Sequence, residues 1–282
     1  MKIAVGGIVH ARSSIDPWLK HLAALDAGGH ELIPVFVEDP GSEERRCLHN
    51  ILSAFPAAIV ETADGATADN AYRRRERNKT EAFQRLAFLR NQLAGLALKV
   101  GADALLSVDS DIMAPQDLLG ALVAVGEPWV GALVRNTPQY LALGTAPSTE
   151  TPDAYWNVLY MAPAGRGRPA YEHFKPIGSD GIGGIWPAGA MCFRPHDRQQ
   201  ERRLFVGAVA LYGRQLLETV TWDDPGPTPE DPRSSRRDGE DVSFAYKALA
   251  AGYHAWYIPL ICEHLMSDNL VEEHRSRCPI CA

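Results

Sequence analysis

The first half of the chain alternates between helix-like and strand-like patterns of apolar residues. Residues 80–100 place apolar side chains at three- and four-residue steps, the spacing of an amphipathic helix. Residues 104–108 (Ala-Leu-Leu-Ser-Val) form a short apolar run typical of a buried central strand. Further predicted strands are 2–5, 31–37, 57–60, 129–134 and 255–261, and further predicted helices are 17–26, 116–125 and 241–251. The pattern predicts an α/β fold with a doubly wound, mostly parallel central sheet and helices on both faces.

The second half has weaker periodicity and two long segments rich in turn-forming residues, 136–184 and 222–239. Loops of this length in a compact domain usually cover a functional site or are disordered. A chain of 282 residues suits one large domain. We therefore expect a single domain over residues 1–265, with mobile loops in its second half, followed by a C-terminal tail over residues 266–282.

Composition narrows the class of protein. The chain is 46% hydrophobic and carries a net charge of −7, which argues against a dedicated nucleic-acid-binding surface but leaves room for a local basic groove. No run approaches the roughly 20 apolar residues that span a bilayer, and the first residues lack the apolar run of a signal peptide. The five cysteines are unevenly placed and do not suggest a disulfide framework. We expect a cytoplasmic protein without a transmembrane segment.

Two aspartates, Asp109 and Asp111, directly follow the predicted strand 104–108. Ligands of open α/β sheets bind at the carboxyl ends of strands, and residues two apart in an extended segment point the same way. Mg²⁺ or Mn²⁺ favours one or two carboxylates together with water and phosphate oxygens, and it stabilises a departing diphosphate. The alternative is a solvated turn in which Ser110 and Asp111 cap the next segment.

The segment Leu105-Leu106-Ser107-Val108-Asp109-Ser110-Asp111-Ile112 resembles the metal-binding signature of GT-A glycosyltransferases. The preceding helix carries Arg90-Asn91, which is similar to the Arg-Asn helix upstream of that signature in several families, including the Anp1-type mannosyltransferases. The resemblance implies a GT-A fold, a Mn²⁺ or Mg²⁺ ion on Asp111, a donor-orienting role for Asp109, and donor binding by Arg90. It leaves Asp109 as a further candidate metal ligand.

A second acidic position, Asp39, follows the predicted strand 31–37. It is similar to the acidic strand end that holds the donor base in family 2 glycosyltransferases. The alternative is an Asp-Pro-Gly turn that needs no ligand.

The pair Glu240-Asp241 precedes a predicted helix. Carboxylates there can simply stabilise the helix N-terminus. The pair also resembles the Glu-Asp motif of GT-A enzymes, which implies that Asp241 deprotonates the acceptor hydroxyl and that Glu240 lies on the acceptor side. A base of this kind must be ionised near neutral pH, and a preceding long loop suits a substrate cover.

Three later residues carry weaker signals. The resemblance implies that His264 is a further metal ligand, although a single histidine is often a surface or core residue. The segment 183–191 resembles the glycine-containing acceptor side of GT-A enzymes, which implies that Trp186 stacks on a sugar and that Gly189 permits close approach. The alternative for that segment is an ordinary tight turn with a core tryptophan.

The C-terminal Cys278-Pro-Ile-Cys281 has the spacing of half a zinc site. Cys262, His264 or His274 could complete the ligands. The alternative is a frayed tail.

Together these features predict that a sugar is transferred from a UDP- or GDP-sugar to a hydroxyl of an unidentified acceptor. The resemblance implies a nucleotide-sugar-binding half over residues 1–135 and an acceptor-side half over residues 136–265. Two departures from the pattern are the absence of the Pro-x-Tyr-Asn motif of family 2 enzymes and of the Gln-x-x-Arg-Trp motif of processive synthases. The alternatives are a nucleotidyltransferase on a similar sheet and a non-catalytic module that binds nucleotides or glycans.

Overall fold

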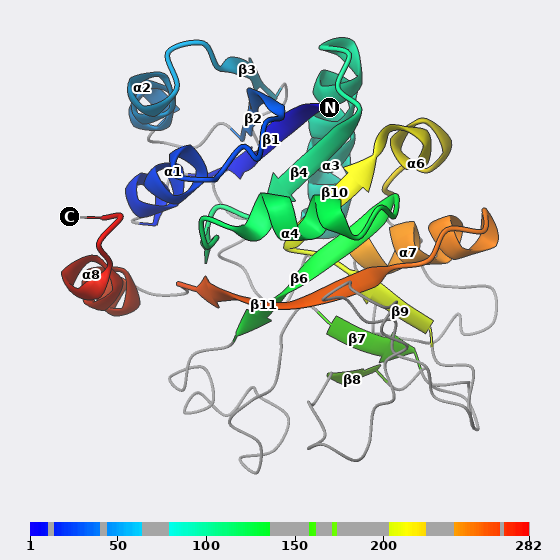
Figure 1. Ribbon diagram of the computed structural model, residues 1–282. Helices are drawn as coiled ribbons and strands as arrows, with labels where there is room; N and C mark the ends of the chain where they lie inside the picture. The colour runs from blue at the N-terminus through cyan, green and yellow to red at the C-terminus, as the bar shows by residue number, and fades with distance from the viewer. Residues whose placement is uncertain are drawn as a thin grey trace, which may run out of the picture.

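The computed structural model describes residues 1–10, 14–39, 44–63, 79–135, 158–161, 171–173, 203–223, 240–265 and 268–281 (Figure 1). The described residues form an eight-stranded sheet in the order β3-β2-β1-β4-β10-β6-β11-β5 and a three-stranded sheet in the order β8-β7-β9. The large sheet holds most of the predicted strands and defines the domain.

The strands of the large sheet are β1 (Lys2–Val9), β2 (Glu31–Glu38), β3 (Ile59–Thr62), β4 (Ala104–Val108), β5 (Ile112–Met113), β6 (Trp129–Arg135), β10 (Val209–Gly213) and β11 (Trp256–His264). The small sheet comprises β7 (Val158–Met161), β8 (Tyr171–His173) and β9 (Arg203–Val206). The helices are α1 (Ile15–Ala23), α2 (Glu44–Ala54), α3 (Lys79–Lys99), α4 (Leu118–Ala124), α6 (Arg214–Thr219), α7 (Glu240–Ala250) and α8 (Asp268–Arg277).

The large sheet is mostly parallel, as predicted. Strands β3, β2, β1 and β4 pair in parallel, and β11 pairs in parallel with β6. Strand β10 is antiparallel to both of its neighbours, β4 and β6, and the short edge strand β5 is antiparallel to β11. Because β1, β2 and β4 run in one direction, their carboxyl ends lie at one edge of the sheet.

Helices cover both faces of the sheet, and each face has its own apolar core. One core joins α3, α6 and α7 to the sheet, and the other joins α1, α2, α4 and α8 to the opposite face. Successive strand residues point to opposite faces, so Leu105 belongs to the first core and Leu106 to the second. Both leucines are almost completely buried, as predicted for a central strand.

Strand β1 does not end at Gly6-Gly7 as predicted but continues to Val9. A Cβ at Gly6 would overlap the Val35 carbonyl of β2, and one at Gly7 would overlap the Val108 carbonyl of β4. The two glycines therefore permit close backbone approach inside the sheet and do not terminate the strand.

The described elements without a predicted counterpart include α2, β10 and α8. Strand β10 lies between β4 and β6, although its five residues come from the half of the chain with weak periodicity. Helix α8 forms within the segment predicted as a tail. Its Leu270 and Val271 are buried in the same core as α1, so this segment is packed against the domain (Figure 1).

Candidate active site

The connection between β4 and β5 carries the predicted acidic pair and is held by its backbone. The Asp109 N–H donates to Ala208 O at 2.8 Å, which ties the connection to the start of β10. The Leu265 N–H donates to Asp111 O at 2.8 Å, which ties it to the end of β11. The Ser14 hydroxyl donates to the carbonyl of buried Ser110 at 2.9 Å. These contacts come from three distant parts of the chain, so the pair is positioned by the fold.

Arg90 of α3 contacts three of the predicted site carboxylates. Its Nη1 lies 3.3 Å from Asp109 Oδ1, and its Nε lies 3.2 Å from Glu240 Oε1 and 3.3 Å from Asp241 Oδ1. The Arg90 side chain is only 7% exposed, so its guanidinium is largely shielded from water. The structure therefore brings together four predicted site residues from α3, the end of β4 and the start of α7.

This cluster carries more negative than positive charge. Burial alone would lower the pKa of Arg90, but attraction to Asp241, Asp109 and Glu240 outweighs burial and raises it. Burial raises the pKa of Asp241 to about 7, with repulsion from Glu240 and Asp109 adding to the effect and Arg90 opposing it. Burial likewise raises the pKa of Glu240. One guanidinium facing three carboxylates leaves a site that favours a further cation or a proton.

A tight corner between β9 and β10 shapes the cluster. Ala208 has φ of 63°, a left-handed conformation that costs a non-glycine residue energy and is concentrated at functional sites. A Cβ on the adjacent Gly207 would overlap the Asp241 carboxylate. Neither residue was predicted as part of the site. The sequence feature that could have indicated them is a glycine just before a strand-like run of apolar residues.

Asn91, the neighbour of Arg90, holds a second segment at the site. Its Nδ2 donates to Trp222 O at 2.7 Å, and the Trp222 N–H donates to Asn91 Oδ1 at 2.9 Å. The Trp222 ring stacks on Phe244 of α7, with centroids 4.0 Å apart and an interplanar angle of 16°. Asn91 thus links α3 to the aromatic packing of α7, whose first turn carries Asp241. Trp222 was not predicted as a positioning residue.

Asp111 and His264 form the candidate site for the donor-linked cation. His264 Nε2 lies 3.5 Å from Asp111 Oδ2, because β11 and β5 pair His264 with Ile112, the residue after Asp111. Within the described residues, the buried Nδ1 of His264 has no hydrogen-bond partner. A carboxylate and an imidazole suit Mn²⁺, which accepts both oxygen and nitrogen ligands. The residues present therefore fit a divalent cation.

Asp39 lies one residue beyond β2, at the same edge of the sheet. Arg85 donates to Asp39 Oδ1 from Nη2 at 2.7 Å and from Nε at 3.0 Å, and His10 Nδ1 lies 3.3 Å from Oδ2. Burial alone would raise the pKa of Asp39, but the contacts with His10 and Arg85 outweigh it and lower the pKa. Asp39 is therefore ionised at neutral pH, with its oxygens facing His10 and Arg85.

The predicted acceptor-side residues Trp186 and Gly189 lie outside the described residues. None of the described helices is long and apolar enough to cross a membrane.

Comparisons with known proteins identify the fold. No protein-family model and no curated protein sequence matches the chain. Among solved structures, GalNAc-T7 with UDP, GalNAc and Mn²⁺ matches with a TM-score of 0.56 and 13% identity, over 94% of this chain and 44% of that one. The chain has the GT-A fold. The predicted fold class is therefore confirmed.

Two further solved structures match with lower TM-scores. They are Staphylococcus aureus TarS 1-349 (TM-score 0.47, 13% identity, 98% of this chain and 64% of that one) and the mannosyltransferase PcManGT from Pyrobaculum calidifontis with GDP-Man and Mn²⁺ (0.44, 14%, 97% and 59%). The chain spans less than two thirds of each of these three solved chains.

Proposed function

We propose that this protein is a metal-dependent glycosyltransferase that moves a sugar from a nucleoside-diphosphate sugar, UDP- or GDP-linked, to an acceptor hydroxyl. The observation that carries the proposal is the convergence of Asp109, Glu240 and Asp241 on buried Arg90, at the carboxyl edge of a GT-A sheet. Asp111 and His264 stand on the adjoining β4–β5 connection and the end of β11.

The donor side is assigned to residues 1–135, with His264 added from β11. Asp111 and His264 would hold Mn²⁺ or Mg²⁺, which when bound neutralises charge on the departing diphosphate. Asp109 orients the donor: Arg90 holds Oδ1, and the side chain is 34% exposed, so it can meet a ligand. Asp39, ionised at the end of β2, is assigned to the donor base.

The acceptor side is assigned to residues 136–265. Asp241 takes the proton of the acceptor hydroxyl, whose oxygen attacks the anomeric carbon as the bond from that carbon to the diphosphate oxygen breaks. Its side chain is 21% exposed, and a base with a pKa of about 7 is matched to neutral pH. Glu240 is buried and holds Arg90, while Trp186 and Gly189 are assigned to acceptor binding.

The proposal is tested by incubating the purified protein with UDP- and GDP-sugars and Mn²⁺ and analysing the products of slow donor hydrolysis. Release of nucleoside diphosphate supports sugar transfer. A nucleotidyltransferase would instead convert the nucleotide-sugar and added pyrophosphate into a nucleoside triphosphate and a sugar 1-phosphate, and ligand binding without turnover would indicate a binding module. Asp241→Asn should keep donor binding and lose turnover, whereas Asp268→Asn, at an exposed aspartate of α8, should leave both unchanged.

A further inference from the structure

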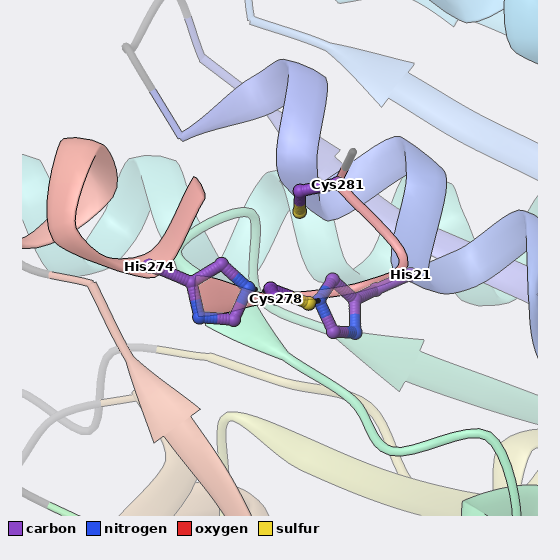
Figure 2. Close-up of side chains that lie close together, drawn as sticks. All are labelled: His21, His274, Cys278 and Cys281. Atoms are coloured by element: carbon purple, nitrogen blue, oxygen red, sulfur yellow. Dashed lines mark hydrogen bonds between the residues drawn. The ribbon is translucent and has the colours of Figure 1, made fainter. Parts of the chain in front are cut away.

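Four potential metal ligands from the two ends of the chain lie together: His21, His274, Cys278 and Cys281 (Figure 2). One ligand atom from each side chain fits within a group whose members all lie within 4.8 Å of one another. His21 Nε2 lies 2.9 Å from His274 Nε2 and 3.4 Å from Cys278 Sγ. Among the described residues, this is the one group of three or more His, Cys, Asp or Glu side chains with such spacing.

Local structure brings three of these residues to one place. His274 is in the last turn of α8, and the Cys278 N–H donates to His274 O at 2.9 Å, so the two side chains lie one turn apart on the same helix face. A further turn, in which the Cys281 N–H donates to Cys278 O at 3.1 Å, returns Cys281 toward Cys278. The fourth residue, His21, comes from the last turn of α1, and its neighbour Lys20 donates to Cys281 O at 2.9 Å.

The outer nitrogen of each histidine has an acceptor that determines its tautomer. His21 Nδ1 lies 2.7 Å from the carbonyl of Ala114, and His274 Nδ1 lies 2.8 Å from the carboxylate of Glu263. A carbonyl and a carboxylate accept hydrogen bonds, so both Nδ1 atoms carry hydrogen. In neutral rings each Nε2 would carry a lone pair that faces the other across 2.9 Å. Two facing lone pairs repel each other unless a proton or a metal cation lies between or beside them.

We propose that these four side chains bind one structural zinc ion. Two imidazole nitrogens and two thiolates form the Cys₂His₂ set of tetrahedral structural zinc sites. The hydrogen bonds to Ala114 and Glu263 are the outer contacts that orient zinc-binding histidines. The thiols bind as thiolates, so two protons pass to solvent when the ion enters.

The four side chains are mostly shielded from solvent, as in a structural metal site, but a metal ion can still reach them. His21 and His274 are 5% and 4% exposed, and both cysteines are partly exposed. A surface hollow of about 630 Å³ is lined in part by His21, His274 and Cys278, which provides a path for the ion.

The zinc site is separate from the candidate donor-metal site, yet it supports the same edge of the sheet. Cys262 and His264, two of the residues considered as completing ligands, are not members of the group. Glu263 and His264 are neighbours on β11, and consecutive strand residues point to opposite faces. Glu263 therefore meets the zinc ligand His274 while His264 meets Asp111. His21 of α1 is hydrogen-bonded to Ala114, the residue that follows β5. A zinc ion would therefore link α1 and α8 to this short edge strand.

The test begins with the wild-type chain, purified under reducing conditions without added metal, and its metal content measured by elemental analysis. We expect about one zinc per chain. Replacing zinc with Co²⁺ should give the strong visible bands and thiolate charge-transfer absorption of tetrahedral cobalt. Neither measurement requires a variant that could fail to fold.

Variants then assign the ligands. His274→Gln and Cys278→Ser should lose stoichiometric zinc, whereas His49→Gln and Cys47→Ala should keep it, as should Asp111→Asn at the donor-metal site. Glu263→Gln should weaken zinc affinity about 10- to 100-fold, measured by competition with a chromophoric chelator, because Glu263 orients a ligand and is not one. The proposal is overturned by a reduced wild-type chain without zinc, by an octahedral cobalt spectrum, or by a Cys278–Cys281 disulfide in the purified protein.

Discussion

Arg90 Nη1 lies 3.3 Å from Asp109 Oδ1, and the two residues are separated by 19 positions in the chain. The same guanidinium pairs with Glu240 and Asp241, more than a hundred residues further along. Arg90 therefore links the segment after β4 to the first turn of α7. Because the arginine is buried, leaving any of these charges unpaired would be costly.

Replacing this arginine is expected to destabilise the protein substantially. Arg90→Gln leaves three carboxylates without their buried counter-charge, and we expect a loss of about 3–5 kcal/mol in the free energy of unfolding. Urea titration followed by circular dichroism measures it. Arg214→Gln is the matched control, since Arg214 pairs with Glu218 at a distance of 2.7 Å on the exposed surface of α6. An exposed pair contributes about 0–1 kcal/mol, so equal losses in the two variants would contradict the assignment.

The raised pKa of Asp241 predicts a pH-dependent difference in stability. In the folded protein the Asp241 carboxyl keeps its proton up to a pH of about 7, whereas in the unfolded chain it releases the proton near the ordinary aspartate pKa of 3.8. Between those values the folded state binds more protons than the unfolded state, so this group's contribution to stability falls as pH rises toward 7. Asp241→Asn removes the contribution.

The variant's stability relative to wild type should therefore increase from pH 5 to pH 8, measured by urea unfolding at each pH without added metal. Comparing the two proteins at the same pH removes the titrations that they share. A difference that stays constant across this range would contradict the raised pKa.

Gly207 is predicted to be essential for the geometry of the base. In Gly207→Ala the new methyl group must displace the Asp241 carboxylate, and a displacement of about 1 Å can reduce a rate about 100-fold. Donor turnover should fall by roughly this factor while donor binding is retained. Gly95→Ala in α3 is the control, because nothing lies within 4 Å of its added Cβ. The Gly95→Ala variant should gain about 0.5–1 kcal/mol of stability, because alanine is the better helix former. Comparable turnover in the two variants would show that Gly207 does not shape the active site.

Asn91 is predicted to position α7 through Trp222. Asn91→Ala leaves the backbone N–H and carbonyl of Trp222 without these partners, at a cost of about 1–3 kcal/mol for each group that stays buried. Thermal unfolding should show a lower Tm, and the 16° stacking of Trp222 on Phe244 should loosen, which changes the near-ultraviolet circular dichroism. An unchanged near-ultraviolet spectrum would show that the aromatic packing holds this segment without Asn91.

Local sequence patterns were sufficient to predict the bounds of helices and strands whose burial follows one regular pattern along their whole length. Strand β4 has the predicted bounds because all five residues are buried and a glycine turn and an aspartate flank it. Helix α3 follows its long apolar repeat within one residue at each end. The mostly parallel α/β sheet was predictable because these elements alternate in the order that such a sheet requires, whereas the GT-A assignment came from the resemblance of residues 105–112 to a known signature.

Contacts between distant segments were not predictable in the same way. Gly6-Gly7 signalled a strand end locally, but β1 continues there because its neighbours' carbonyls approach closely. Strand β10 is short, and its position between β4 and β6 depends on pairing that no local pattern encodes. The Cys-x-x-Cys spacing indicated half of a metal site, yet His21 is 253 residues away from His274 and reads locally as one buried residue on α1.

The central claim is that Asp111 and His264 bind a nucleoside diphosphate through a divalent cation, and calorimetric titration of UDP and GDP tests it most directly. Wild-type protein should bind one of these nucleotides in the presence of Mn²⁺ and much more weakly after the metal is chelated. In the presence of Mn²⁺, Asp111→Asn should bind that nucleotide at least tenfold more weakly than wild type, a loss of about 1.4 kcal/mol. Equal affinity with and without Mn²⁺, or an Asp111→Asn variant that binds as tightly as wild type, would contradict the account.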